Sequence, residues 1–128
     1  MQKPLQVGSV HHVSFRVDNL ETALAFYEGV LGCRRLPRPD GLPGARGAWL
    51  KSGSTEVHLT EAPADEATGY PPSRIVPFAC HVAFHVDDLD ALEAGLSARG
   101  VERLRGDFGL AQIFVRDPSG NLLEFTPY

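Results

Sequence analysis

The sequence predicts an α+β fold in which one structural unit occurs twice. Residues 12–20 read HVSFRVDNL and residues 81–89 read HVAFHVDDL, and each segment is an alternating strand led by a histidine, followed by an Asp-rich turn that opens a helix. A second pair of matching strands follows: EVHLT carries His58, and LLEFT carries Glu124 at the equivalent position. Two halves of strand, helix and then two or three strands are typical of an α+β domain.

The first half begins with a strand over 10–17. Alternation places His12, Ser14 and Arg16 on one face of this strand and apolar side chains on the other. Further along the chain, the Pro/Gly-rich segment LPRPDGLPGARG predicts a loop over 36–47. Two strands follow the loop, and they are expected at 47–51 and 55–60.

A helix is expected over 20–31. Asp18 lies three residues before Glu21, which is a capping-box pattern, and Gly32 is placed to end the helix. Apolar residues at helical spacing predict the buried face of this helix: Leu20, Leu24, Tyr27 and Leu31.

The second half repeats this plan after a connector over 61–79, which contains four prolines and has no clear period. A strand is expected at 80–86, and the turn 87–90 predicts the start of a helix that ends at Gly100. Its buried face is expected to comprise Leu89, Leu92 and Leu96. Strands at 111–116 and 121–126 flank the tight turn DPSGN.

Length and composition place the chain among ordinary globular domains. Its 128 residues predict one domain, with a first module over about 8–60 and a second over about 80–127. The net charge of −4 argues against nucleic-acid binding, and no apolar run predicts a membrane segment or signal peptide. Cys33 and Cys80 have no metal-type spacing, so we expect reduced thiols in the cytoplasm.

Four residues at equivalent positions in the two halves are candidate metal ligands: His12, His58, His81 and Glu124. Imidazole nitrogen and carboxylate oxygen suit Fe(II), Mn(II), Ni(II), Co(II) or Zn(II). Two histidines with one carboxylate form a facial triad with open positions. Such a triad would leave His58 as a supporting group or a substrate contact.

Four further residues are candidates for substrate contacts or catalysis. His85 shares a face with His81. His85 and Glu124 are candidates for acid–base catalysis. The alternative for His85 is that it only lines a cavity. Arg16 could clamp an anionic substrate or simply be a solvated strand end. Trp49 and Phe114 occupy matching later strands, where they could wall a pocket or belong to the core. His11 has the opposite parity to His12 and is expected to face the helices or solvent.

Together, HHVSFRVDNLETALAFYEGVLGC, EVHLTE, HVAFHVDDLDAL and FVRDPSGNLLEF resemble the vicinal oxygen chelate superfamily of glyoxalases, bleomycin resistance proteins and extradiol dioxygenases. The resemblance covers about residues 8–127. It implies two βαβββ modules that form a cupped mixed sheet around a metal, with the helices on the outer face. It also implies a homodimer, because in many small members one cup combines modules from two chains.

The resemblance assigns the metal ligands to His12, His58, His81 and Glu124. Glyoxalase I-like members commonly have Glu or Gln at the position of His58, so the histidine is a departure. Members that act on fosfomycin carry a longer C-terminal segment, whereas this chain ends at Tyr128. Bleomycin-binding members usually lack the ligand set.

These considerations give three functional hypotheses. The first is a divalent-metal-dependent lyase or isomerase of the glyoxalase type, which chelates a small substrate through vicinal oxygens and forms a metal-stabilised enediolate. The second is an Fe(II) extradiol-type ring-cleaving dioxygenase. The third is a metal-free protein that binds a small toxic compound. Four protein ligands would leave two positions on an octahedral ion, which a bidentate substrate would fill, so ligation by His58 favours the non-redox reaction.

Overall fold

The computed structural model describes residues 1–42, 46–63, 65–66, 68–107 and 110–128. It contains two modules with the same order of elements. The first comprises β1 (His12–Val17), α1 (Leu20–Tyr27), β2 (Arg34–Leu36), β3 (Gly47–Ser52) and β4 (Thr55–Glu61). The second comprises β5 (Val82–His85), α2 (Leu89–Ala98), β6 (Arg103–Asp107), β7 (Ala111–Arg116) and β8 (Leu122–Thr126). The predicted α+β fold of two βαβββ modules is confirmed.

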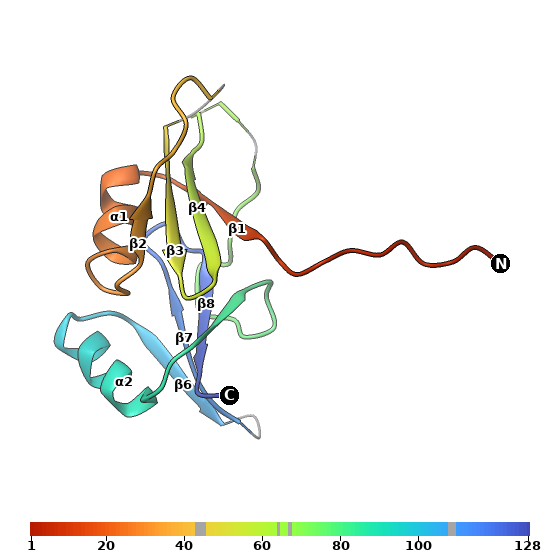
Figure 1. Ribbon diagram of the computed structural model, residues 1–128. Helices are drawn as coiled ribbons and strands as arrows, with labels where there is room; N and C mark the ends of the chain where they lie inside the picture. The colour runs from red at the N-terminus through yellow and green to blue at the C-terminus, as the bar shows by residue number, and fades with distance from the viewer. Residues whose placement is uncertain (43–45, 64, 67, 108–109) are drawn as a thin grey trace.

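Each module forms a four-stranded mixed sheet of the same topology. The strand orders are β1-β4-β3-β2 and β5-β8-β7-β6, and in each sheet the first strand runs parallel to the last while the other pairs are antiparallel. Both helices lie on the same side of the molecule, each against its own sheet, and the N-terminal segment extends away from the body (Figure 1).

The register of the two sheets is also the same around the candidate ligands. His58 on β4 lies between Ser14 on β1 and Trp49 on β3. Glu124 on β8 lies between Ala83 on β5 and Phe114 on β7. The two halves of the sequence therefore place a polar residue at the same point of each sheet, with an aromatic residue on one neighbouring strand.

The helices begin at side-chain caps close to the predicted positions. The Asn19 side chain accepts a hydrogen bond from the Thr22 backbone N–H, so the first cap is Asn19 and not the predicted Asp18. Asp88 caps the second helix through the Ala91 N–H. Helix α1 ends at Tyr27, four residues before the predicted end, because residues 28–31 continue as turns towards the positive φ of Gly32.

The core lies between the helices and the sheets. Alternation holds along β1, where Phe15 and Val17 are buried while His12 and Ser14 are exposed. Of the predicted helix face, Leu20 and Tyr27 are buried, while Leu24 and Leu31 pack at the margin. The largest fully buried side chains come from both modules: Tyr27, Leu50, Leu59, Leu96, Ile113 and Leu123.

A buried polar junction joins the two modules at the turn between β7 and β8. The Tyr27 hydroxyl donates to Asp117 Oδ2 at 2.6 Å, and burial next to this carboxylate raises the pKa of Tyr27. Asn121 Nδ2 donates to the Arg16 carbonyl at 2.9 Å, and the Asp18 backbone N–H donates to Ser119 Oγ at 2.9 Å. The buried Tyr27–Asp117 hydrogen bond, with the two less buried ones, links the second module to the first.

Helices α1 and α2 have 8 and 10 residues. In the described part of the chain, no helix is both long and apolar enough to cross a bilayer.

Candidate metal centre

The second module holds its two candidate ligands in a geometry suited to a cation. His81 Nε2 lies 3.7 Å from Glu124 Oε1. The other ring nitrogen of His81, Nδ1, lies 2.7 Å from the Ala79 carbonyl and donates to it. This hydrogen bond selects the tautomer in which Nε2 carries the lone pair, which is the usual arrangement behind a metal-binding histidine.

Glu124 is held from the other side by Gln112 on β7. Gln112 Nε2 donates to Glu124 Oε1 at 2.7 Å. Glu124 is 9% exposed, so this hydrogen bond compensates part of the cost of burying its charge. A buried carboxylate directed at an imidazole nitrogen can supply, together with that nitrogen, two of the ligands of a divalent-metal site.

A small cavity of about 220 Å³ opens on this pair. The ring of His81 meets Phe114 edge to face, with 5.5 Å between the ring centroids. Phe114 therefore lies beside the candidate ligands, as expected for a pocket wall, although it is also buried. The cavity is lined by Pro77, Phe78, His81, Gln112, Phe114 and Glu124.

In the first module, the two candidate ligands are stacked on each other. The rings of His12 and His58 lie 4.0 Å apart with 14° between their planes, and Trp49 stacks on His58 at 4.5 Å. The His58 side chain is 12% exposed, and burial lowers its pKa, which keeps the imidazole neutral. Trp49 thus contacts a candidate ligand, as Phe114 does in the second module.

Stacking prevents His12 and His58 from binding one ion in this packing. A metal bound by imidazole lies in the ring plane at about 2.0–2.1 Å from the nitrogen. Nearly parallel rings that stack face to face, as these do, have lone pairs that do not converge. One ring has to turn before both can bind the same ion, and His12 is the exposed member of the pair.

Glu56 and His11 lie next to the stacked pair His12 and His58. Glu56 Oε1 lies 3.5 Å from His58 Nε2, and its Oε2 lies 3.3 Å from His11 Nε2. His11 Nδ1 is 2.9 Å from His12 Nδ1. His11 lies just before the start of β1, and its side chain is 74% exposed, which agrees with the expectation that it faces solvent.

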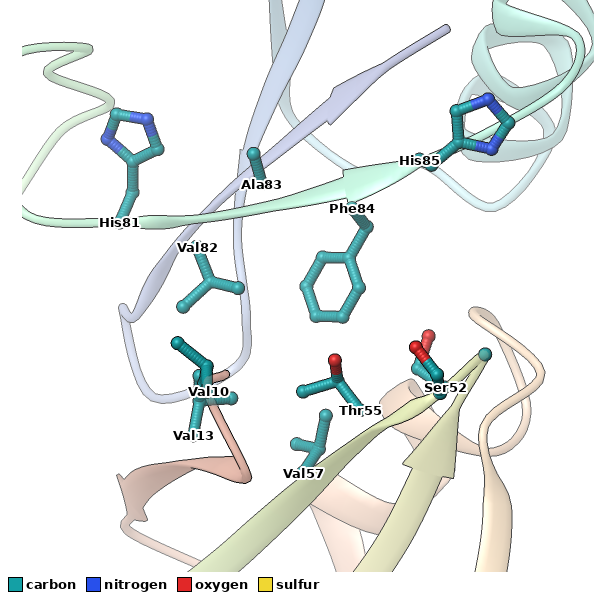
Figure 2. A pocket seen from close by; sticks show the side chains of 12 residues that line it. Val10, Val13, Ser52, Thr55, Val57, His81, Val82, Ala83, Phe84 and His85 are labelled. Atoms are coloured by element: carbon teal, nitrogen blue, oxygen red, sulfur yellow. The ribbon is translucent and has the colours of Figure 1, made fainter. Parts of the chain in front are cut away.

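Within one chain the four candidate ligands form two pairs and not one cluster. Among the residues that the structure describes, no three His, Cys, Asp or Glu side chains could hold one metal ion. A cavity of about 560 Å³ separates β5 from the first module. Figure 2 shows Val82 and Phe84 directed towards Val10, Val13 and Val57 across this cavity, while the rings of His81 and His85 point to the other side of β5.

The remaining predicted site residues lie away from both pairs. His85 is at the exposed end of β5, opposite Thr126 and 3.9 Å from Asp87. Arg16 forms an ion pair with Asp18 and lines a separate cavity of about 240 Å³ with Tyr70 and Asn121.

Gln112 and Glu56 are site residues that were not predicted from the sequence. Each lies two residues from a residue that was predicted, Gln112 before Phe114 and Glu56 before His58. Because side chains two apart on a strand share a face, this spacing was a usable signal. The role of the Ala79 carbonyl had no sequence signal.

Comparison with known families agrees with the fold. Residues 9–125 match the Glyoxalase/Bleomycin resistance protein/Dioxygenase superfamily. The chain belongs to this superfamily. It is 30% identical over 126 residues to Glyoxylase I 4 of Arabidopsis thaliana, and the match covers 94% of this chain and 71% of that protein. It is 29% identical to the metallothiol transferase FosB of Shouchella clausii, over 92% of this chain and 79% of that protein.

Two solved structures share the fold. A glyoxalase family protein from Enterococcus faecalis superposes with a TM-score of 0.72 at 28% identity, covering 92% of this chain and 96% of that one. An antibiotic binding protein from a Streptomyces species gives a TM-score of 0.72 at 23% identity, covering 96% and 98%. Proteins named for catalysis and for binding thus share one architecture, and the choice between them has to come from the site.

Proposed function

We propose that this protein is a divalent-metal-dependent enzyme of the glyoxalase type, a lyase or isomerase that acts on a small substrate chelated through vicinal oxygens. The observation that carries the proposal is the pair His81 and Glu124, with Nε2 and Oε1 3.7 Å apart and each side chain held by its own hydrogen bond. A buried carboxylate directed at an imidazole is a pairing that a metal site uses directly.

The residues fit a divalent ion by their chemistry. His12, His81 and Glu124 supply two imidazoles and a carboxylate, and His58 is the fourth candidate; Fe, Ni, Co, Mn and Zn all accept this set. When bound, such an ion polarises the substrate oxygens and stabilises negative charge that develops on them.

The complete ligand set requires two copies of the chain. The pairs of one chain lie on separate sheets, and each pair is too small for a closed site. A twofold homodimer could place the first module of one copy against the second module of its partner and form two equal sites. The superfamily resemblance supports this arrangement.

Glu124 is the group that we assign to proton transfer. Its carboxylate is buried, lines the cavity next to Phe114 and Phe78, and is fixed by Gln112, so it can hold a proton at Oε1 or Oε2 close to a bound substrate. We assign His85 as a second acid–base group because its ring points to the same side of β5 as that of His81 (Figure 2). Its side chain lies at the exposed end of the strand, so this assignment has less support than that of Glu124.

Fe(II) extradiol-type dioxygenation is the second candidate. The packing of His58 favours it, because a ring held between Trp49 and His12 is poorly placed to bind metal. Ligation by His12, His81 and Glu124 alone would leave positions for both a catecholate and O₂.

Metal analysis followed by two activity assays tests the proposal. We expect the purified protein to hold close to one divalent ion per chain and to convert a hemithioacetal without consuming oxygen. Glu124→Gln should lower both metal content and turnover while the thermal unfolding temperature of the metal-free protein stays unchanged. Oxygen uptake with catechols and bound iron would favour dioxygenation. Retained ligand binding without any metal would favour a binding protein.

A further inference from the structure

We propose that Gln112 is the positioning residue for Glu124, the residue that holds this carboxylate in the orientation required for metal binding. The inference rests on the proposed metal site and assigns a role within it. Gln112 lines the same cavity of about 220 Å³ as His81 and Glu124. Its Nε2 donates to Glu124 Oε1 at 2.7 Å.

The hydrogen bond acts on the oxygen that faces the histidine. Glu124 Oε1 is the atom 3.7 Å from His81 Nε2, and it is also the acceptor for Gln112. An ionised carboxylate has about four lone-pair sites, so accepting one hydrogen bond leaves the group able to bind a cation. The contact therefore limits rotation of the carboxylate without blocking it.

The side-chain amide of Gln112 is oriented with its nitrogen towards the Glu124 carboxylate. An ionised carboxylate only accepts hydrogen bonds, which requires that the nitrogen of the amide faces it. The amide oxygen, Gln112 Oε1, is then buried and has no hydrogen-bond partner among the described residues. A buried acceptor without a partner costs stability, so the orientation is not explained by the packing of Gln112 itself.

The first module lacks an equivalent group. Gln112 precedes Phe114 by two residues, and the position two before Trp49 is Gly47. A Cβ atom at Gly47 would lie 2.6 Å from the Leu59 carbonyl oxygen, so this position has no room for a side chain. The amide is thus specific to the module that carries the carboxylate ligand.

Cobalt(II) binding tests the role without any need for a substrate. We would titrate the metal-free protein with Co(II) in competition with a chromogenic chelator and record the visible spectrum of the bound ion. Gln112→Leu removes the donor, and Gln112→Asn keeps an amide that is one methylene too short to reach. Both variants should bind Co(II) about 10–100-fold more weakly, the usual cost of losing a partner behind a metal ligand. Their Co(II) spectra should also change shape, because a loosened carboxylate alters the coordination geometry.

Thr126→Val is the matched control. Thr126 lies on the same face of β8 as Glu124, and its hydroxyl donates to the Ala111 carbonyl at 3.4 Å without touching the carboxylate. This variant should keep the wild-type affinity and spectrum. Wild-type affinity and spectrum in both Gln112 variants would overturn the positioning role and leave the metal site intact. Absence of Co(II) binding by the wild-type protein would instead refute the proposed metal site, and the positioning role with it.

Discussion

The two modules share a backbone plan but treat their candidate ligands differently. In the second module, His81 and Glu124 are separate side chains, each fixed by its own hydrogen bond to Ala79 or Gln112. In the first module, His12 and His58 stack on each other. Strand order and register around these residues are the same in both sheets, so they do not account for the difference.

Besides the Ala79 carbonyl behind His81, side chains at equivalent positions differ between the modules. The first module has Glu56 two residues before its candidate ligand, and this carboxylate approaches both His58 and His11. The second module has the apolar Leu122 at that position and Gln112 where the first has Gly47. For the proposed metal site, the second module is therefore preorganised, whereas the first must turn a ring. Preorganisation lowers the cost of binding.

The largest expected effect comes from combining defective modules. His12→Ala damages the first module and Glu124→Gln the second, so each variant alone should lose metal binding. If each site is shared between two copies, mixing the unfolded variants and refolding them should restore about a quarter of the sites, because about half of the dimers are mixed and each of those has one intact site. Metal content after gel filtration measures this. A mixture as empty as its parents would place each site within one chain.

The next largest effect is a difference in Co(II) affinity between variants that each lack one candidate ligand, one from each module. His81→Asn should weaken Co(II) binding by more than about 100-fold, beyond the cost of losing only a supporting partner. His58→Asn should weaken binding by less than about 10-fold, because the stacked ring does not reach the ion. Isothermal titration gives both affinities. Equal losses would show that His58 leaves the stack and is a full ligand.

The junction between the modules gives an effect on stability alone. Tyr27 and Leu96 occupy equivalent helix positions and both are fully buried, but Tyr27 donates to Asp117. Tyr27→Phe leaves that buried carboxylate short of one donor and should lower the free energy of unfolding by about 1–3 kcal/mol. Urea denaturation measures the change. Leu96→Met is a packing control of similar volume at the equivalent position. An unchanged free energy of unfolding in Tyr27→Phe would contradict a stabilising role for the hydrogen bond.

The smallest effects, and the most similar between modules, are expected at the helix caps. Asn19 and Asp88 each accept a backbone N–H of the first turn at 2.9 Å. Alanine at either position should cost about 1 kcal/mol of unfolding free energy. Thermal and urea denaturation of the two variants check this. A cost confined to one of them would mean that the modules differ in stability as well as in their ligands.

The sequence by itself determined the repeated fold and the face on which each candidate ligand lies. Strand alternation and helix periodicity are local properties, so His12, His58 and Glu124 could be placed on their strands without coordinates. His81 was predicted within a strand over 80–86, but it lies just before β5. The same reasoning located Trp49 and Phe114, which do contact candidate ligands. It placed the first cap one residue early, because Asp18 and Asn19 can both act as caps and only the backbone turn selects one.

Only the tertiary structure decided how these groups meet. The stacking of His12 on His58, the amide of Gln112 on Glu124 and the Ala79 carbonyl behind His81 depend on distances between strands, which no local pattern encodes. The separation of the ligands into two pairs has the same origin, since it follows from how one sheet is set against the other. Sequence periodicity fixes the direction of a side chain relative to its own strand, but the packing of distant segments decides which groups that side chain contacts.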